Sequence, residues 1–297
     1  MTLLTDERWH ELLERRVRNP GAVGRAYRDR RRRASLLSPG GTLFLVAADH
    51  PARGSLGVGG DPLAMVDRRD LLERLLVALE NPAVDGLLGT PDVIEELLLL
   101  SALHDKVVIG SMNRGGLAGA DWEIDDRFTA YTARAIAESR LDGGKMLLRM
   151  VDSDPGTVPT LEACANAVSE LAANGLMAMV EPLPYDREGG KLVLRKDTAS
   201  LARAATVASG LGVTSAHTWL KLPAPEDAAV LDSTTLPVVV LGGVPSADPA
   251  ADLASWGRTL RHHAVRGLVV GRALLYPPDG DVGAAVAAAA KVLEAAK

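Results

Sequence analysis

Residues 218–223 read TWLKLP and residues 237–243 read PVVVLGG, and these two neighbouring stretches decide the fold. Each is a short apolar run bounded by proline or glycine, which is typical of a buried strand. Similar runs recur along the chain at intervals of roughly 30 residues, and helical patterns lie between them. We expect strands at residues 42–48, 86–89, 106–111, 145–151, 177–181, 218–222, 237–241 and 267–271.

Helical patterns follow seven of the eight strands, and we count eight strand–helix units in all. The helical patterns lie at residues 68–80, 91–103, 126–139, 160–174, 196–210, 249–263 and 281–296. A doubly wound open sheet more often stops at about five to seven strands, and no G-x-G-x-x-G follows the first strand. We therefore predict an α/β fold, a closed (β/α)8 TIM barrel. The 297 residues would form one domain, with a barrel at 42–297 and an N-terminal helical extension at 1–38 that covers the barrel bottom or a subunit contact.

Composition excludes several classes of protein. Apolar residues make up 47% of the chain and charged residues 24%, which is an ordinary globular balance, and the net charge of -5 gives no general attraction to nucleic acid. The single cysteine, Cys164, excludes an internal disulfide, and we interpret it as a buried structural thiol. The N-terminus lacks the apolar core of a signal peptide, and no apolar run reaches the ~20 residues of a membrane span. We expect a cytoplasmic protein without a membrane partner.

Lys221 is the most informative single residue. A lysine that a strand carries into the interior is desolvated, so its pKa falls and its free amine can attack a carbonyl near neutral pH. The alternative is a lysine at a strand end whose ammonium reaches water or pairs with a carboxylate. The sequence of this segment leaves both readings open.

Other polar residues follow the predicted strands, where barrel enzymes carry their chemistry. Asp49 and His50 follow the first strand, Asn113 and Arg114 follow the third, and Glu181 ends the fifth. Because strand side chains alternate, Asp49, Glu181 and Lys221 fall on the faces that we expect to point into the barrel.

Strand four carries two cations on one face. Lys145 opens the predicted strand, so its amine either reaches up through the interior or lies below the site. Arg149 ends the strand, and two readings stay open: contact with a substrate carboxylate, or a salt bridge to Asp152 or Glu181.

A phosphate site is indicated after the last two strands. Gly242 and Gly243 follow the seventh strand, and Gly271 and Arg272 follow the eighth, where barrels of this kind bind phosphate. Glycines let backbone N–H groups approach an anion, and a guanidinium grips it in a bidentate way. A bare tight turn is the alternative for the glycine pair.

The order of these motifs resembles the class I, Schiff-base aldolases of the tagatose-bisphosphate and bacterial fructose-bisphosphate type. Within that group it is most similar to an actinobacterial, deoxyribose-phosphate-aldolase-like branch associated with myo-inositol breakdown. The resemblance covers residues 42–276 and rests on Asp49-His50-Pro-x-Arg-Gly, Gly-Lys145-Met-Leu-Leu, Val-Glu181-Pro, Leu-Lys221-Leu-Pro, Gly242-Gly243 and Gly271-Arg272. His50, Arg53 and Arg149 depart from the usual pattern.

The resemblance implies a retro-aldol reaction with Lys221 as the Schiff-base lysine and Lys145 as the second lysine. Glu181 is our candidate base, and Asp49 is either a second acid/base or the group that shuttles protons to the carbinolamine intermediates. His50, Arg149 and the phosphate elements would bind substrate. The implied substrate is the phosphorylated 2-deoxy-5-keto-gluconate, which would give dihydroxyacetone phosphate and malonic semialdehyde. No cofactor is implied.

Three alternatives belong to other classes. Asp49, His50 and Glu181 could chelate Mg²⁺ or Mn²⁺ in a metal-dependent aldolase, although no pair of the six histidines has the spacing of a strong zinc site. The barrel could also bind a sugar phosphate without turnover. The arginine run at positions 28 and 30–33 could contact nucleic acid, but without interleaved aromatics we favour a solvated helix face or an oligomer contact. We expect a metal-free homo-oligomer that binds a sugar phosphate and no nucleic acid.

Overall fold

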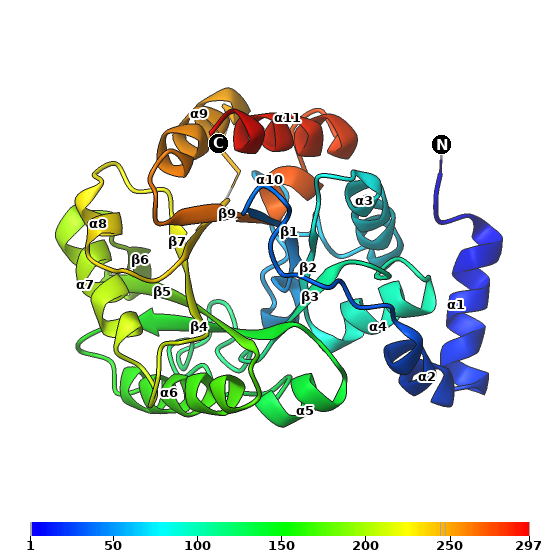
Figure 1. Cartoon of the computed structure of the whole chain (residues 1–297), viewed down its shortest axis with the longest axis horizontal. Coiled ribbons are helices and arrows are strands. Elements are labelled where there is room, and N and C mark those ends of the chain that lie inside the picture. Colours follow the sequence, from blue (N-terminus) through cyan, green and yellow to red (C-terminus); the bar gives the residue numbers. More distant parts are fainter. Residues whose placement is uncertain (1, 244, 247, 297) are drawn as a thin grey trace.

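Eight parallel strands close into a barrel that helices surround (Figure 1). The computed structural model describes residues 2–243, 245–246 and 248–296. Met1 and Lys297, the ends of the single domain that we predicted, lie outside the described residues. The strands are β1 (Leu43–Ala48), β2 (Gly86–Gly89), β3 (Val107–Ser111), β4 (Gly143–Met150), β5 (Met177–Glu188), β6 (Lys191–Leu194), β7 (Thr218–Pro223), β8 (Val238–Leu241) and β9 (Val265–Val270).

The helices alternate with these strands. They are α1 (Asp6–Arg18), α2 (Gly21–Asp29), α3 (Arg68–Glu80), α4 (Pro91–Leu99), α5 (Ala133–Glu138), α6 (Thr157–Ala173), α7 (Thr198–Ser209), α8 (Ala229–Asp232), α9 (Pro249–Leu260), α10 (Arg272–Leu275) and α11 (Val282–Ala295), with a 3-10 turn at Pro51–Arg53. In the described part of the chain, no helix has the length and apolarity that crossing a membrane requires.

The sheet closes because β4 pairs with β5 and β1 pairs with β9. Around the barrel the parallel order is β1, β2, β3, β4, β5, β7, β8, β9, whereas β6 pairs antiparallel with the end of β5. This arrangement confirms the predicted TIM barrel. It also adds a hairpin that the sequence analysis missed, because β5 continues to Glu188 instead of ending at Glu181.

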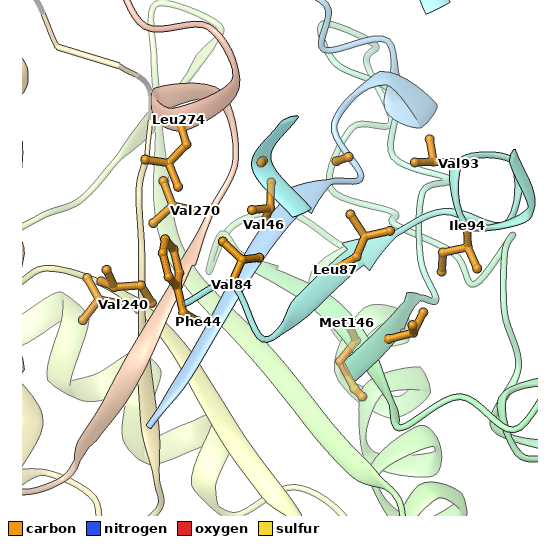
Figure 2. Packing of buried hydrophobic residues seen from close by; sticks show 14 of the residues in the cluster. Phe44, Val46, Val84, Leu87, Val93, Ile94, Met146, Val240, Val270 and Leu274 are labelled. Carbon is orange, nitrogen blue, oxygen red and sulfur yellow. The ribbon is translucent and has the colours of Figure 1, made fainter. Parts of the chain in front are cut away.

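Two hydrophobic clusters follow the strand alternation. Leu43 and Leu45 of β1 point inward and join the cluster that fills the barrel, together with Met177 and Met179 of β5. The intervening residues pack outward against the helices, as Figure 2 shows for Phe44 and its neighbours. The inward phase of β1 and β5 continues to Asp49 and Glu181, so the two carboxylates arrive at the barrel mouth on the interior side.

The arginine run after α2 lies at the opposite end of the barrel. Arg30 is 1% exposed, and its guanidinium donates to the carbonyl of Lys106 at 2.9 Å and to Asp142 at 3.2 Å. Arg32 also pairs with Asp142, and Arg33 pairs with Asp85. The expected solvated helix face is therefore only partly right: Arg28 of α2 is exposed, whereas Arg30 lies beyond the end of α2 and is buried against Asp142. The oligomer contact stays a prediction.

Candidate active site

Lys221 lies inside the barrel near the end of β7. It is level with Val239 of β8, and the residue is 3% exposed. Its Nζ donates to Glu181 Oε1 at 2.9 Å. The amine is thus both buried and paired with a carboxylate, which combines the two readings that the sequence left open.

Lys145 reaches the same carboxylate from β4. Its register partner on β3 is Ser111, the last residue of that strand, so Lys145 lies near the mouth of the barrel and not at its bottom. Lys145 Nζ pairs with Glu181 Oε2 and lies 3.1 Å from Asp49 Oδ2. The two lysines and the two carboxylates therefore form one continuous chain of ion pairs.

Arg114 completes this chain from the loop after β3. Its guanidinium pairs with Asp49, and its Nε donates to Ser111 Oγ at 3.0 Å. Ser111 Oγ in turn donates to Asp49 Oδ2 at 3.3 Å. The sequence analysis noted Arg114 at a strand end but gave it no role; the structure shows that it fixes Asp49.

Burial dominates the electrostatics of these groups. It holds the pKa of Lys145 well below its ordinary value and lowers the pKa of Lys221, although the charge of Glu181 opposes both shifts. It also lowers the pKa of Arg114 to about 10. For Glu181, burial alone would raise the pKa, but the charges of Lys145 and Lys221 outweigh it and hold the pKa below its usual range. Buried amines with lowered pKa values are suited to nucleophilic attack.

The predicted phosphate elements border the same cavity. Gly243 has a φ of 67°, a left-handed conformation that favours glycine. At Gly242 a Cβ atom would lie 2.3 Å from Val270 Cγ1, so the loop leaves no room for a side chain there. Arg272 donates to the carbonyl of Gly57 at 3.3 Å, and its buried Nε has no partner among the described residues.

The cavity has a volume of about 140 Å³. Its walls contain the ion-paired residues around Lys221 and the predicted phosphate elements. They also contain Arg53 and three residues of the β5–β6 hairpin region. The lining side chains and glycines include Asp49, His50, Arg53, Arg114, Lys145, Glu181, Leu183, Tyr185, Leu194, Lys221, Gly242, Gly243, Gly271 and Arg272. Tyr185 and Leu194 were missed because the predicted fifth strand stopped at Glu181.

His50 lies against the glycine of the last strand end. A Cβ atom on Gly271 would lie 3.2 Å from His50 Cε1, so this glycine makes room for the ring. Burial holds the pKa of His50 well below its ordinary value, and the charges of Arg272 and Lys221 lower it further. The imidazole is therefore neutral at physiological pH, and its Nδ1 lies 3.7 Å from Asp49 Oδ1.

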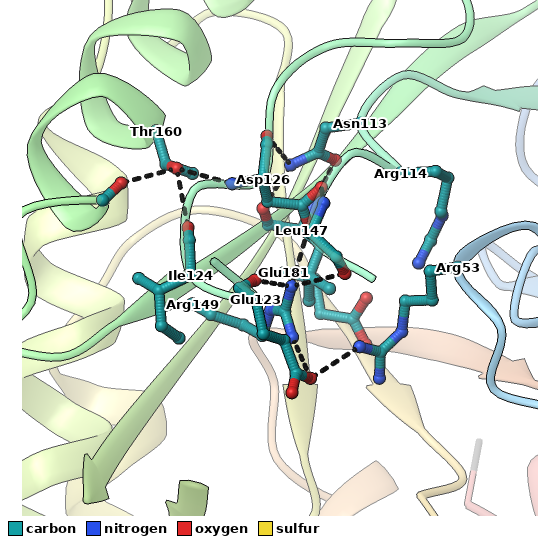
Figure 3. Close-up of polar contacts among 12 residues, drawn as sticks. Arg53, Asn113, Arg114, Glu123, Ile124, Asp126, Leu147, Arg149, Thr160 and Glu181 are labelled. Carbon is teal, nitrogen blue, oxygen red and sulfur yellow. Dashed lines mark hydrogen bonds and ion pairs between the residues drawn. The ribbon is translucent and has the colours of Figure 1, made fainter. Parts of the chain in front are cut away.

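Arg149 does not line this cavity. Its guanidinium pairs with Glu123 and Asp126 and donates to the carbonyls of Gly116 and Glu123 (Figure 3). The salt-bridge reading of Arg149 needs correction: its partners are the loop carboxylates Glu123 and Asp126, and neither Asp152 nor Glu181 is its partner among the residues described. The sequence does carry a signal for these partners, namely the acidic residues between β3 and α5. We had expected that segment to be partly helical. The contact with a substrate carboxylate stays a prediction.

The site offers little to a metal ion. Within the described ranges, no three His, Cys, Asp or Glu side chains gather in a group that could hold one. Asp49 and Glu181 each contact cationic side chains instead. A divalent cation between these carboxylates would face the charges of two lysines and an arginine.

Comparisons with known proteins place the chain. Among solved structures, Cgl0159 from Corynebacterium glutamicum matches with a TM-score of 0.96 and 47% identity over 99% of both chains. An archaeal fructose 1,6-bisphosphate aldolase matches with a TM-score of 0.67 and 18% identity, over 87% of this chain and 96% of its own. A Schiff base-forming fructose-1,6-bisphosphate aldolase matches with a TM-score of 0.62 and 17% identity over the same shares.

At such low identity the two aldolases show a shared fold, and the expected resemblance to class I aldolases is confirmed at that level. No curated protein matches the chain. The model of the Cgl0159-like family matches residues 41–290, which is most of the barrel and its last helix. The chain belongs to the Cgl0159-like family.

Proposed function

We propose that this protein is a class I aldolase that cleaves a phosphorylated keto-sugar or keto-sugar acid through an imine on Lys221. One observation carries the proposal: Lys221 and Lys145 share the carboxylate of Glu181 inside a cavity that Gly243 and Arg272 also border. An amine of lowered pKa thus lines the same cavity as the residues that we propose to bind the phosphate. The shared fold with Schiff base-forming aldolases supports this assignment.

The chemistry follows from the positions of these groups. The neutral amine of Lys221 attacks the keto carbon, and loss of water from the carbinolamine gives an iminium ion. Glu181 accepts the proton of the substrate hydroxyl as the neighbouring C–C bond breaks, and the bonding electrons move into the iminium to form an enamine. The aldehyde leaves, the enamine carbon is reprotonated, and water releases the ketone and restores the amine.

Lys145 and Asp49 act around this centre. In its protonated form Lys145 stabilises the ionised form of Glu181, and Asp49 favours that protonated form from the other side of Lys145. In this proposal Asp49 also passes protons to the carbinolamine. Gly243 and Arg272 hold the phosphate, and His50 offers a neutral imidazole to a substrate hydroxyl. Fixing the phosphate would hold the keto carbon against the Lys221 amine.

The substrate is proposed at the level of a class. Sequence resemblance alone favours the phosphorylated 2-deoxy-5-keto-gluconate of myo-inositol breakdown. Arg149 lends this no support, because Glu123 and Asp126 occupy its guanidinium. Homo-oligomeric assembly and a cytoplasmic location remain predictions, and light scattering of the purified protein tests the first.

Turnover assays test the proposal against its rivals. We expect release of dihydroxyacetone phosphate from at least one member of a panel of ketose bisphosphates and phosphorylated keto-sugar acids, with activity unchanged after prolonged EDTA treatment. Activity that EDTA removes and Mn²⁺ or Mg²⁺ restores would favour the metal-dependent aldolase. Tight binding of the same compounds without turnover would favour a non-catalytic barrel.

A further inference from the structure

Arg53 is a cation of the cavity wall that the proposed reaction does not yet use. It ends the 3-10 turn after β1, and its guanidinium donates to Glu123 Oε1 at 3.2 Å. Glu123 lies in the loop between β3 and α5, whose Ala118 N–H donates to the Arg53 carbonyl at 2.8 Å. The backbone of Arg53 is thus fixed by this loop, while its side chain lines the cavity. Figure 3 shows the contact between Arg53 and Glu123.

Glu123 does not depend on Arg53 for a partner. The oxygen that Arg53 contacts also accepts from Arg149 at 2.5 Å, and the Arg149 side chain is 1% exposed whereas that of Arg53 is 16% exposed. Asp126 supplies a second carboxylate for Arg149. If Arg53 turned away, Glu123 would keep a buried cationic partner, so the exchange leaves no buried charge unpaired.

Arg53 and Arg272 approach the same part of the cavity. Arg272 donates to the carbonyl of Gly57, which lies in the same loop as Arg53, four residues further on. Burial lowers the pKa of Arg272, and the charge of Arg53 is the next cause, so the two guanidinium groups repel each other across the wall. The Arg272 Nε is buried with no partner among the described residues. Two converging cations and an open donor fit a dianion such as phosphate.

We infer that Arg53 is a second phosphate-binding residue, which exchanges Glu123 for the substrate phosphate that it shares with Arg272. The inference rests on the proposed function for the identity of the substrate and deepens it by naming what selects phosphorylated compounds. Glu123 is then a built-in competitor: it holds Arg53 in place when the cavity contains no phosphate. Removing the charge of Arg53 should weaken phosphate binding, whereas removing the charge of Glu123 should strengthen it.

Calorimetric titration of the full-length protein with inorganic phosphate tests this without any catalytic step. We expect Arg53→Met to weaken phosphate binding about tenfold to a hundredfold, the loss of a charge-assisted contact, and Arg53→Lys to fall between this variant and the wild type. Glu123→Gln should tighten binding, since the amide still accepts from Arg149 but no longer competes as an anion. Arg187→Met is the matched control: it removes a cation that pairs with Asp154 and does not line the cavity.

Several outcomes would overturn the inference. The first is an unchanged phosphate affinity in Arg53→Met, or a loss of affinity no larger than that of Arg187→Met. The second is an equal loss of phosphate affinity in Arg53→Met and Glu123→Gln, which would show that the Arg53–Glu123 contact only holds the loop in place. A parallel titration with malonate tests whether Arg53 binds carboxylates instead. If Arg53→Met lost malonate binding but kept its affinity for phosphate, Arg53 would be a carboxylate-binding residue, which also contradicts the inference. Failure of the aldolase proposal is a separate result, namely no borohydride adduct on Lys221 while the phosphate titrations behave as expected.

Discussion

The Glu181 carboxylate lies 2.9 Å from the Lys221 amine, and both groups are buried at the mouth of the barrel. Each therefore sets the protonation of the other. While Lys221 is charged it holds the pKa of Glu181 low, which makes Glu181 a weak base. While the amine is neutral, one of the two cations beside Glu181 is absent and the basicity of Glu181 rises. The iminium ion then restores a positive charge at the Lys221 nitrogen, and that charge is neutralised as the C–C bond breaks and the enamine forms.

Glu181→Gln should separate imine formation from bond cleavage. The amide cannot accept the hydroxyl proton, so we expect turnover to fall by about 10² to 10⁴. The amine of Lys221 remains, so borohydride trapping with dihydroxyacetone phosphate should continue. Comparison of turnover with the mass of the trapped protein measures both effects, and equal loss of the two would remove Glu181 from the role of base.

The pH dependence of trapping should report the lowered pKa of Lys221. Burial lowers that pKa from its ordinary value and Glu181 opposes the shift. The neutral amine should therefore become available at a lower pH than for an exposed lysine, and Glu181→Gln should move the midpoint lower still. A pH series of trapping yields gives both midpoints; a midpoint that moves upward in Glu181→Gln would contradict this account of the pair.

Arg272→Ala should penalise phosphorylated substrates selectively. Loss of a charge-assisted contact worth about 1.5 to 3 kcal/mol corresponds to roughly a tenfold to hundredfold fall in kcat/KM. An unphosphorylated analogue should lose nothing by the same change. Steady-state kinetics on a matched pair of substrates decides the matter, and an equal loss for both would show that Arg272 supports the fold and not the phosphate.

Arg149→Met should destabilise the protein. It leaves the buried carboxylate of Asp126 and the carbonyls around it without their cation. Breaking a buried pair costs about 3 to 5 kcal/mol. Arg134→Met, which breaks an exposed pair with Glu138, should cost far less. Urea unfolding of both variants measures the two free energies. Similar values would show that the Arg149 cluster does not hold the loop.

Much of the site could be predicted because it follows strand phase. A period of two carries the inward face of β1 to Asp49, that of β5 to Glu181 and that of β7 to Lys221, so local sequence was enough. The depth of Lys145 could not be read this way, since it depends on the stagger between β3 and β4, which places Ser111 level with Lys145.

The remaining errors come from contacts distant in sequence. Arg149 meets Glu123 and Asp126, which precede it by 26 and 23 residues in the loop between β3 and α5, so Asp152 and Glu181 were the wrong choices of ion-pair partner. Arg30 is likewise buried by Asp142, a residue more than a hundred positions later. A run of charged residues therefore indicates solvent exposure only where no carboxylate from a distant part of the chain forms ion pairs with it.

The central claim is the imine on Lys221, and borohydride trapping tests it most directly. The wild-type protein is incubated with dihydroxyacetone phosphate, reduced, digested and mapped by mass spectrometry, with Lys221→Arg as the control, because a guanidinium stays protonated and cannot form the imine. We predict one adduct, on the peptide that carries Lys221, together with loss of activity and no adduct in Lys221→Arg. An adduct on Lys145 in the wild type, or full activity in Lys221→Arg, would contradict the account.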